Sequence, residues 1–165
     1  MQNGSLLSRL WMRHQRILPH LRRATLISFI IPLILLDAFT YITLRDDVSA
    51  IIIGEIFQTL SFLPYVYTKD RRVGVAIFSI ALLIIFYVAG SRLVWAWILT
   101  YVIVADLTAA RKSKLALIQL SAFLLAQLIA GIPLLPVTFW TMFWGILSAS
   151  FGVLIRNTKD RLEEM

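Results

Sequence analysis

Residues 73–90 read VGVAIFSIALLIIFYVAG, a run without a single charge that directly follows the basic turn Lys69-Asp70-Arg71-Arg72. A helix of this length and hydrophobicity can cross the hydrocarbon core of a bilayer, which is roughly 30 Å thick. Comparable apolar runs occupy residues 24–44, 48–67, 93–109, 115–135 and 137–155. We therefore expect an all-α, polytopic integral membrane protein with six transmembrane helices.

The composition agrees with this expectation. Of the 165 residues, 59% are hydrophobic and 15% are charged, whereas soluble domains have roughly 45–50% and about 25%. The residues between the runs are too few for a soluble kinase, nucleotide-binding or hydrolase domain. The chain has no cysteine, which excludes disulfides, thiolate metal ligands and cysteine nucleophiles.

The basic residues predict the orientation. Fourteen of the 16 lysines and arginines fall in the N-terminal segment, the loops near residues 69–72 and 111–114, and the C-terminal tail, whereas only Arg45 and Arg92 fall on the other side. Basic loops stay in the cytoplasm, so we expect both termini to be cytoplasmic. Topology and attraction to anionic lipid account for the net charge of +7, and we expect no nucleic-acid partner.

We divide the chain into three parts: an amphipathic juxtamembrane helix over 1–23, the six-helix domain over 24–155, and a basic exit helix over 156–165. In the first part, Trp11 and several leucines recur at helical spacing, with Arg9, Arg13 and Arg16 on the other faces. Such a helix lies in the plane of the lipid headgroups. It is expected to anchor the chain to the bilayer, or alternatively to bind a partner protein. It is too polar before its first apolar run for a signal peptide.

Two acids and one glutamine interrupt the first two spans. Asp37 and Glu55 lie at similar expected depths in neighbouring antiparallel helices, and Gln58 follows Glu55 by one turn. Buried acids in membranes usually face the bundle interior or a water-filled cavity. We treat Asp37, Glu55 and Gln58 as a candidate intramembrane polar site, either for a proton or cation or as neutral groups bonded to neighbouring helices.

Asp106 stands near the cytoplasmic end of the fourth expected span. Arg111, Lys112 and Lys114 follow it closely. The proximity in sequence predicts that Asp106 is an interfacial acid paired with these cations.

The last span carries small residues at a helix-packing spacing. Gly145 precedes Ala149 by four residues, and Ser148 precedes Gly152 by four. Small residues at this spacing let helices approach closely. We expect them to pack within the chain, or alternatively to form a homodimer.

No catalytic constellation is apparent. The two histidines, His14 and His20, lack ligand spacing to an acid. No glycine-rich phosphate loop, nucleophile elbow or His-Glu-x-x-His motif occurs. We expect no catalytic residues, no metal site and no cofactor, and therefore no enzyme in these residues.

The order of features from about residue 60 resembles a known family. Leu63-Pro64-Tyr65-Val66-Tyr67 leads to the basic turn, Trp97-Ile98-Leu99-Thr100-Tyr101 leads to Ala109-Ala110-Arg111-Lys112-Ser113-Lys114, and the last span leads into Arg156-Asn157-Thr158-Lys159-Asp160-Arg161. This resembles the N-terminal membrane sensor region of bacterial two-component histidine kinases of the desaturase-thermosensor and nitrate-regulator class. The resemblance implies a bacterial plasma membrane and a last span that continues into a signalling helix. The phosphoacceptor and ATP-binding domains of that family have no counterpart here, so no catalytic residue carries over.

Three functions remain open. The first is a sensor or signalling module that passes a membrane or small-molecule stimulus through its last helix to a cytoplasmic partner. The second is a small transporter, or the substrate-binding subunit of one, that uses Asp37, Glu55 and Gln58. The third is an accessory structural subunit of a membrane complex.

Overall fold

The computed structural model describes residues 19–44, 48–89 and 97–165, and within these ranges the chain is helical with no strand. A helical segment at 19–28 precedes α2. The helices that follow are α2 (Ile30–Leu44), α3 (Val48–Tyr67), α4 (Arg71–Ala89), α5 (Trp97–Ala109), α6 (Ser113–Ile129) and α7 (Leu134–Glu164). The expected all-α class is thereby confirmed for the described residues.

Among the described residues, three helical stretches are long and apolar enough to cross a membrane: Pro19–Leu36, Arg71–Val88 and Leu134–Glu164. Trp97–Ala109 and Ser113–Ile129 are shorter apolar helices. The structure thus fits a membrane protein, and the number of six spans remains a prediction.

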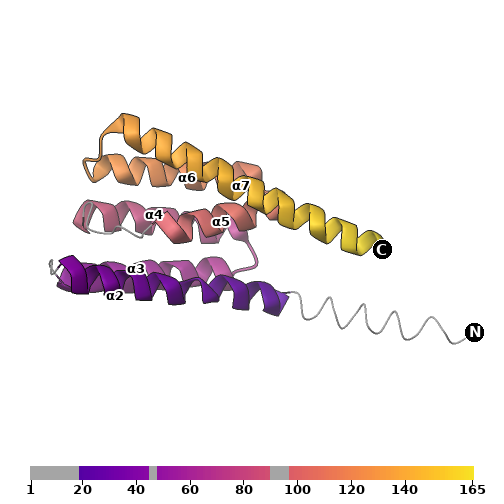
Figure 1. The fold of residues 1–165 in the computed structure, drawn as a ribbon, viewed down its shortest axis with the longest axis horizontal. Helices are drawn as coiled ribbons and strands as arrows, with labels where there is room; N and C mark the ends of the chain where they lie inside the picture. Colours follow the sequence, from indigo (N-terminus) through magenta and orange to yellow (C-terminus); the bar gives the residue numbers. More distant parts are fainter. Residues whose placement is uncertain (1–18, 45–47, 90–96) are drawn as a thin grey trace, which may run out of the picture.

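The helices run back and forth along one long axis (Figure 1). The 68–70 connection, the turn between α5 and α6 and the charged end of α7 lie on the right in that view, and the connection between α6 and α7 lies on the left. We call the right-hand end the basic end, because residues 69–72, 111–114 and 156–161 supply most of its lysines and arginines.

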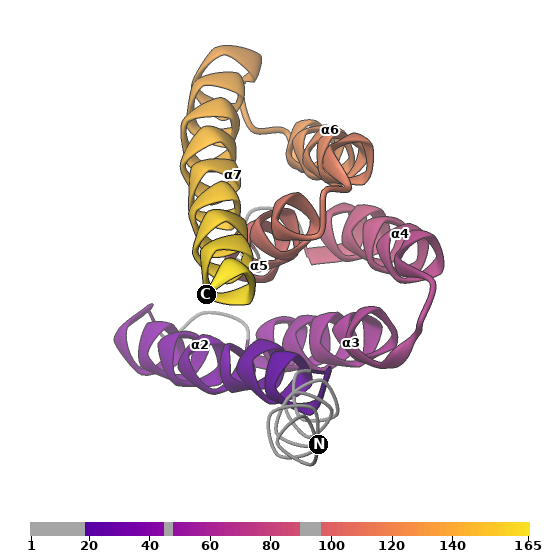
Figure 2. The same ribbon diagram turned by 90° about the vertical axis from the view of Figure 1, so that its right-hand side faces the viewer.

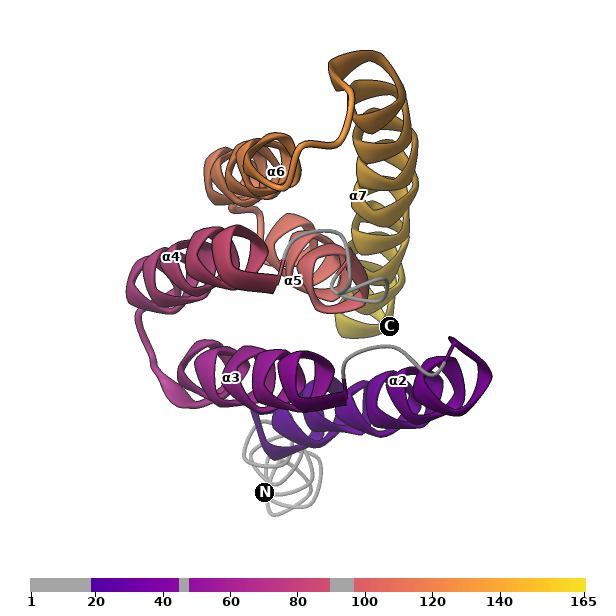
Figure 3. The same cartoon turned by 90° about the vertical axis from the view of Figure 1, so that its left-hand side faces the viewer.

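Packing follows a chain of neighbouring helices. α3 packs on α4, α4 on α6, and α5 on both α6 and α7, while α2 packs on α3 (Figures 2 and 3). Large apolar side chains fill the centre, and the fully buried ones include Phe62, Phe78, Leu82, Leu99 and Ile103. Side chains such as Ile80, Leu117 and Phe139 are more than half exposed on the outside of the bundle. An apolar exterior suits a bundle whose solvent is lipid.

The helix before the last connection ends earlier than expected. We expected spans over 115–135 and 137–155, but α6 ends at Ile129 and α7 begins at Leu134. Gly131 adopts φ +81°, with its N–H donating to the Leu128 carbonyl and the Ile132 N–H donating to the Gln127 carbonyl. This is the left-handed cap at which helices commonly stop, and it moves the turn to residues 130–133.

A break divides the first apolar stretch. The helix over 19–28 is interrupted at Phe29, and α2 resumes at Ile30. Pro32 has no N–H to donate to the Ser28 carbonyl, so the regular hydrogen-bond ladder is lost there. The boundary that we expected between 23 and 24 falls inside the helix over 19–28. Trp11, Arg9, Arg13 and Arg16 lie outside the described residues.

α7 is one uninterrupted helix of 31 residues. The boundary that we expected at 155–156, between the last span and the exit helix, therefore falls inside continuous helix. The apolar and charged parts of α7 therefore belong to one continuous helix.

Glycines set the distance between α7 and its neighbours. Gly145 and Gly152 are both buried. A Cβ on Gly152 would collide with the Ala105 carbonyl oxygen and lie 2.9 Å from Thr108 Cβ, both in α5, and a Cβ on Gly145 would lie 2.9 Å from Leu120 Cδ1 in α6. Ser148 and Ala149 are partly exposed. The two glycines thus allow close approach within the chain.

Candidate functional site

A cluster of ionic side chains joins four helical segments near the basic end. Asp106 in α5 accepts two hydrogen bonds from Arg22, from Nε to Oδ1 at 2.9 Å and from NH2 to Oδ2 at 2.6 Å. The Tyr65 hydroxyl of α3 donates to Oδ2 at 2.5 Å. Arg71, the first residue of α4, places its Nε 3.6 Å from the same oxygen. We call these four residues the Asp106 cluster.

The Asp106 cluster is largely shielded from solvent. The side chains of Asp106, Arg22 and Arg71 are 14%, 26% and 25% exposed, and Tyr65 is fully buried. The Arg22 guanidinium also lies over the Tyr65 ring, 5.7 Å from its centroid. A bidentate arginine–carboxylate pair is among the strongest polar contacts in proteins. Asp106 thus connects the helix over 19–28 to α5, and it contacts α3 and α4 as well.

The charges of the Asp106 cluster do not cancel. Two guanidinium groups face one carboxylate, and the Arg71 Nε is buried without a hydrogen bond to any described residue. A carboxylate near the C-terminus of a helix opposes the helix dipole, and the arginines from other elements compensate for this. Chemically, the cluster can hold the helices together, and it would release them if one of its arginines bound a different anion.

The predicted partners of Asp106 are wrong. The structure pairs it with Arg22 and Arg71, which are distant in sequence, and not with the basic residues that follow it. Arg111 adopts φ +61° and instead binds Asp160 of α7 at 2.9 Å. The left-handed Arg111 follows the end of α5, and its guanidinium is engaged by α7 instead of Asp106.

The candidate intramembrane site is described only in part. Gln58 is fully buried in α3, and both carboxylate oxygens of Glu55, one turn earlier, are shielded from solvent. Asp37 belongs to α2, but its side chain lies outside the described part of the chain. Whether Asp37 meets Glu55 therefore stays a prediction.

Other buried polar side chains connect helices. The Ser79 hydroxyl of α4 donates to Gln119 Oε1 of α6 at 3.0 Å, and Gln127 Nε2 of α6 donates to the Thr141 hydroxyl of α7 at 3.0 Å. Hydrogen bonds of this kind stabilise helix pairs in membranes. Gln119 therefore joins α6 to α4, and Gln127 joins α6 to α7.

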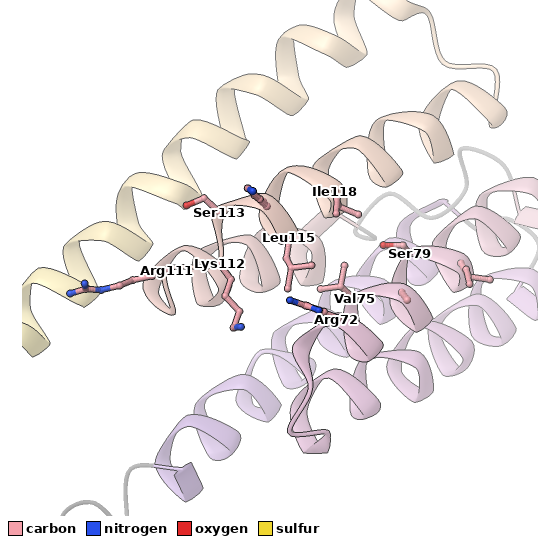
Figure 4. A pocket seen from close by; sticks show the side chains of 11 residues that line it. Arg72, Val75, Ser79, Arg111, Lys112, Ser113, Leu115 and Ile118 are labelled. Atoms are coloured by element: carbon pink, nitrogen blue, oxygen red, sulfur yellow. The ribbon is translucent and has the colours of Figure 1, made fainter.

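A groove lies between α4 and α6 at the basic end, with a volume of about 880 Å³. Arg72, Ser79 and Ile80 of α4 line one side, and Leu115 and Ile118 of α6 line the other. Lys112 of the α5–α6 turn extends toward α4, whereas Arg111 extends away from the groove (Figure 4). The groove thus combines a basic end with an apolar wall.

The described residues contain no group of three or more histidine, cysteine or acidic side chains that could hold a metal ion. Comparison with protein-family models gives no match to the chain, and searches of curated proteins and of solved structures give no significant match.

Sequence reasoning missed the role of Arg22 and Tyr65. Arg22 was assigned only to topology, and Tyr65 only to the resemblance. If the first helix had been predicted to begin at residue 19, Arg22 would have been placed near the level of Asp106, because both lie close to the basic end. That level could be estimated from sequence, but the rotation of each helix could not.

Proposed function

We propose that this chain is a membrane-embedded signalling module with six spans and cytoplasmic termini, in which α7 carries a change in the bilayer to a cytoplasmic partner. The observation that carries this proposal is the continuity of α7. Its 31 residues extend about 46 Å at ~1.5 Å per residue. This exceeds the roughly 30 Å hydrocarbon core, so α7 can reach beyond the membrane without a hinge.

The exit segment of α7 is attached to the bundle. Asp160 binds Arg111 in the turn between α5 and α6. Two turns earlier in α7, Gly152 brings this helix into direct contact with α5, which also carries Asp106. A change in the tilt of α5 or α6 would therefore move the charged end of α7.

The unequal helix lengths favour bilayer thickness as the stimulus. α6 has 17 residues, or about 26 Å at ~1.5 Å per residue. This is shorter than an average hydrocarbon core, and α6 packs against the much longer α7. Helices of unequal length respond differently to thickness, through tilt and local bilayer deformation. The resemblance to histidine-kinase sensor regions supports the same function, since in that family the last span continues into a signalling helix.

Distance measurements between spin labels test the proposal. Because the chain has no native cysteine, Lys69→Cys and Asn157→Cys can be labelled as a pair across the basic end. In bilayers of short-, medium- and long-chain phosphatidylcholine, we expect the mean distance to change by about 1–2 Å or more, the size of helix shifts in known switches.

A second label pair gives the control. Asn157→Cys with Glu164→Cys lies within α7, so its distance should stay constant in every bilayer. If the Lys69–Asn157 distance is also constant, the bundle does not respond to thickness and the proposal is wrong. If the control distance changes, the exit segment deforms by itself, which also contradicts a rigid α7.

A further inference from the structure

We propose that the groove between α4 and α6 binds one anionic phospholipid, with its phosphate at Arg72 and Lys112 and an acyl chain along the apolar wall. No residue of the Asp106 cluster lines this site, and one lining residue, Arg111, is paired with Asp160 of α7. The proposal requires that the bundle lie in a membrane but not that α7 transmits a signal, so either proposal can fail alone.

The charge of the groove selects an anion. The four basic residues of its lining are Arg72, Arg111, Lys112 and Lys114, and the lining includes no acidic residue among the described ones. Arg111 is already paired with Asp160. Arg72 comes from the start of α4 and Lys112 from the turn before α6, and Lys112 reaches toward α4 (Figure 4). Two cations from different elements can hold one phosphate between them.

The wall of the groove suits an acyl chain. Farther from the basic end, the lining is formed by Val75, Ala76, Ile80, Leu115 and Ile118. Ile80 and Ile118 are 59% and 54% exposed, so the groove opens sideways on the outer surface of the bundle. Ser79, which also lines it, is bonded to Gln119 and holds α4 to α6 there.

These features together favour a lipid over a water-soluble anion. A soluble phosphate compound would use the basic end but leave the apolar wall uncovered. A zwitterionic lipid would cover the wall but bring no net negative charge to the cations. Basic pockets between transmembrane helices on the cytoplasmic side bind anionic headgroups in other membrane proteins, and the expected topology puts the basic end on that side.

Native mass spectrometry of the detergent-purified protein tests the site. The chain is titrated with phosphatidylglycerol or phosphatidylcholine of identical acyl chains, and we expect one phosphatidylglycerol to bind in preference. Arg72→Gln with Lys112→Gln should weaken its binding about 30-fold, equivalent to about 2 kcal/mol for two basic contacts near the surface. Binding of phosphatidylcholine should not change.

Further variants separate the headgroup from the chain. Ala76→Trp fills the apolar wall while leaving every charge in place, and should reduce binding of both lipids. Lys69→Gln with Lys159→Gln removes two cations from the same end but outside the groove, and should leave the preference for phosphatidylglycerol unchanged. Circular dichroism and size-exclusion chromatography establish that each variant is folded.

Three results would overturn the proposal. The first is equal binding of the two lipids by the unmodified chain. The second is a preference that survives in the Arg72/Lys112 variant or disappears equally in the Lys69/Lys159 control. The third is displacement of phosphatidylglycerol by excess inorganic phosphate together with no effect of Ala76→Trp, which would identify a site for free phosphate and not for a lipid.

Discussion

The Asp106 side chain contacts residues of three other helical segments: Arg22, Tyr65 and Arg71. Replacing it with asparagine keeps its shape but leaves Arg22 and Arg71 without their carboxylate. Removing one partner of a shielded ion pair is strongly destabilising. With the partial exposure of these side chains taken into account, we expect Asp106→Asn to lower the free energy of unfolding by about 2 kcal/mol, measured by denaturant titration in micelles.

A more exposed ion pair at the basic end supplies the matched control. Arg111 and Asp160 form a similar contact, but their side chains are 70% and 40% exposed. Asp160→Asn should therefore change stability by no more than about 0.5 kcal/mol. A double-mutant cycle on Arg22→Gln and Asp106→Asn should show a coupling of about 1 kcal/mol or more. Strict additivity of the two changes would contradict the direct contact.

Gly152 is the second residue at which a small change should have a large effect. A methyl group there meets backbone of α5, which cannot rotate away, whereas a methyl on Gly145 meets only the flexible Leu120 side chain. We expect Gly152→Ala to cost about 1–3 kcal/mol of stability, the usual range for overpacking, and Gly145→Ala to cost less. Thermal unfolding of the two variants in the same detergent gives the comparison, and equal losses would argue against the close α5–α7 contact.

At the scale of elements, the cap at Gly131 decides where α6 ends. Its φ of +81° is costly for any residue with a Cβ, and no neighbouring atom would meet that Cβ. Gly131→Ala should therefore destabilise through the backbone alone, by roughly 1 kcal/mol. Gly131→Asn should recover part of the loss, because asparagine tolerates this conformation. If alanine and asparagine are equally destabilising, the left-handed cap does not determine the end of α6.

The helices themselves could be predicted from hydrophobicity. Their ends could be predicted only where a local sequence signal, such as flanking charges, was used. The expected span 48–67 coincides with α3, because charged residues flank it on both sides. The expected end at 135 was wrong, although Gly131 followed by Pro133 is a recognised stop signal. α7 was divided at 155–156 because polarity changes there, but a helix needs no break where its solvent changes.

The Asp106 cluster shows what sequence could not supply at this scale. Apolar residues surround each helix of a membrane bundle, so periodicity does not reveal which face turns inward. Asp106 was recognisable as an unusual acid, but its partners depend on the rotation of three other segments. The cations nearest in sequence were therefore the natural prediction for its partners. In the folded bundle, arginines from other helical segments take that place.

At the scale of the whole molecule, the structure places the Pro133 connection and the Lys69 connection at opposite ends of the bundle (Figure 1). If the bundle spans a membrane, these two connections must face opposite compartments, and the excess of positive charge assigns Lys69 to the cytoplasm.

Single cysteines introduced into this cysteine-free chain report the side directly. In intact bacterial cells, a membrane-impermeant maleimide should label Pro133→Cys but neither Lys69→Cys nor Lys112→Cys, and permeabilisation should make both lysine positions reactive. Labelling of Lys69→Cys alone in intact cells would mean that the orientation is inverted, and both proposals would then place their partners on the wrong side. Labelling of Pro133→Cys and Lys69→Cys together would mean that the bundle does not span the membrane, because its two ends would then share one compartment.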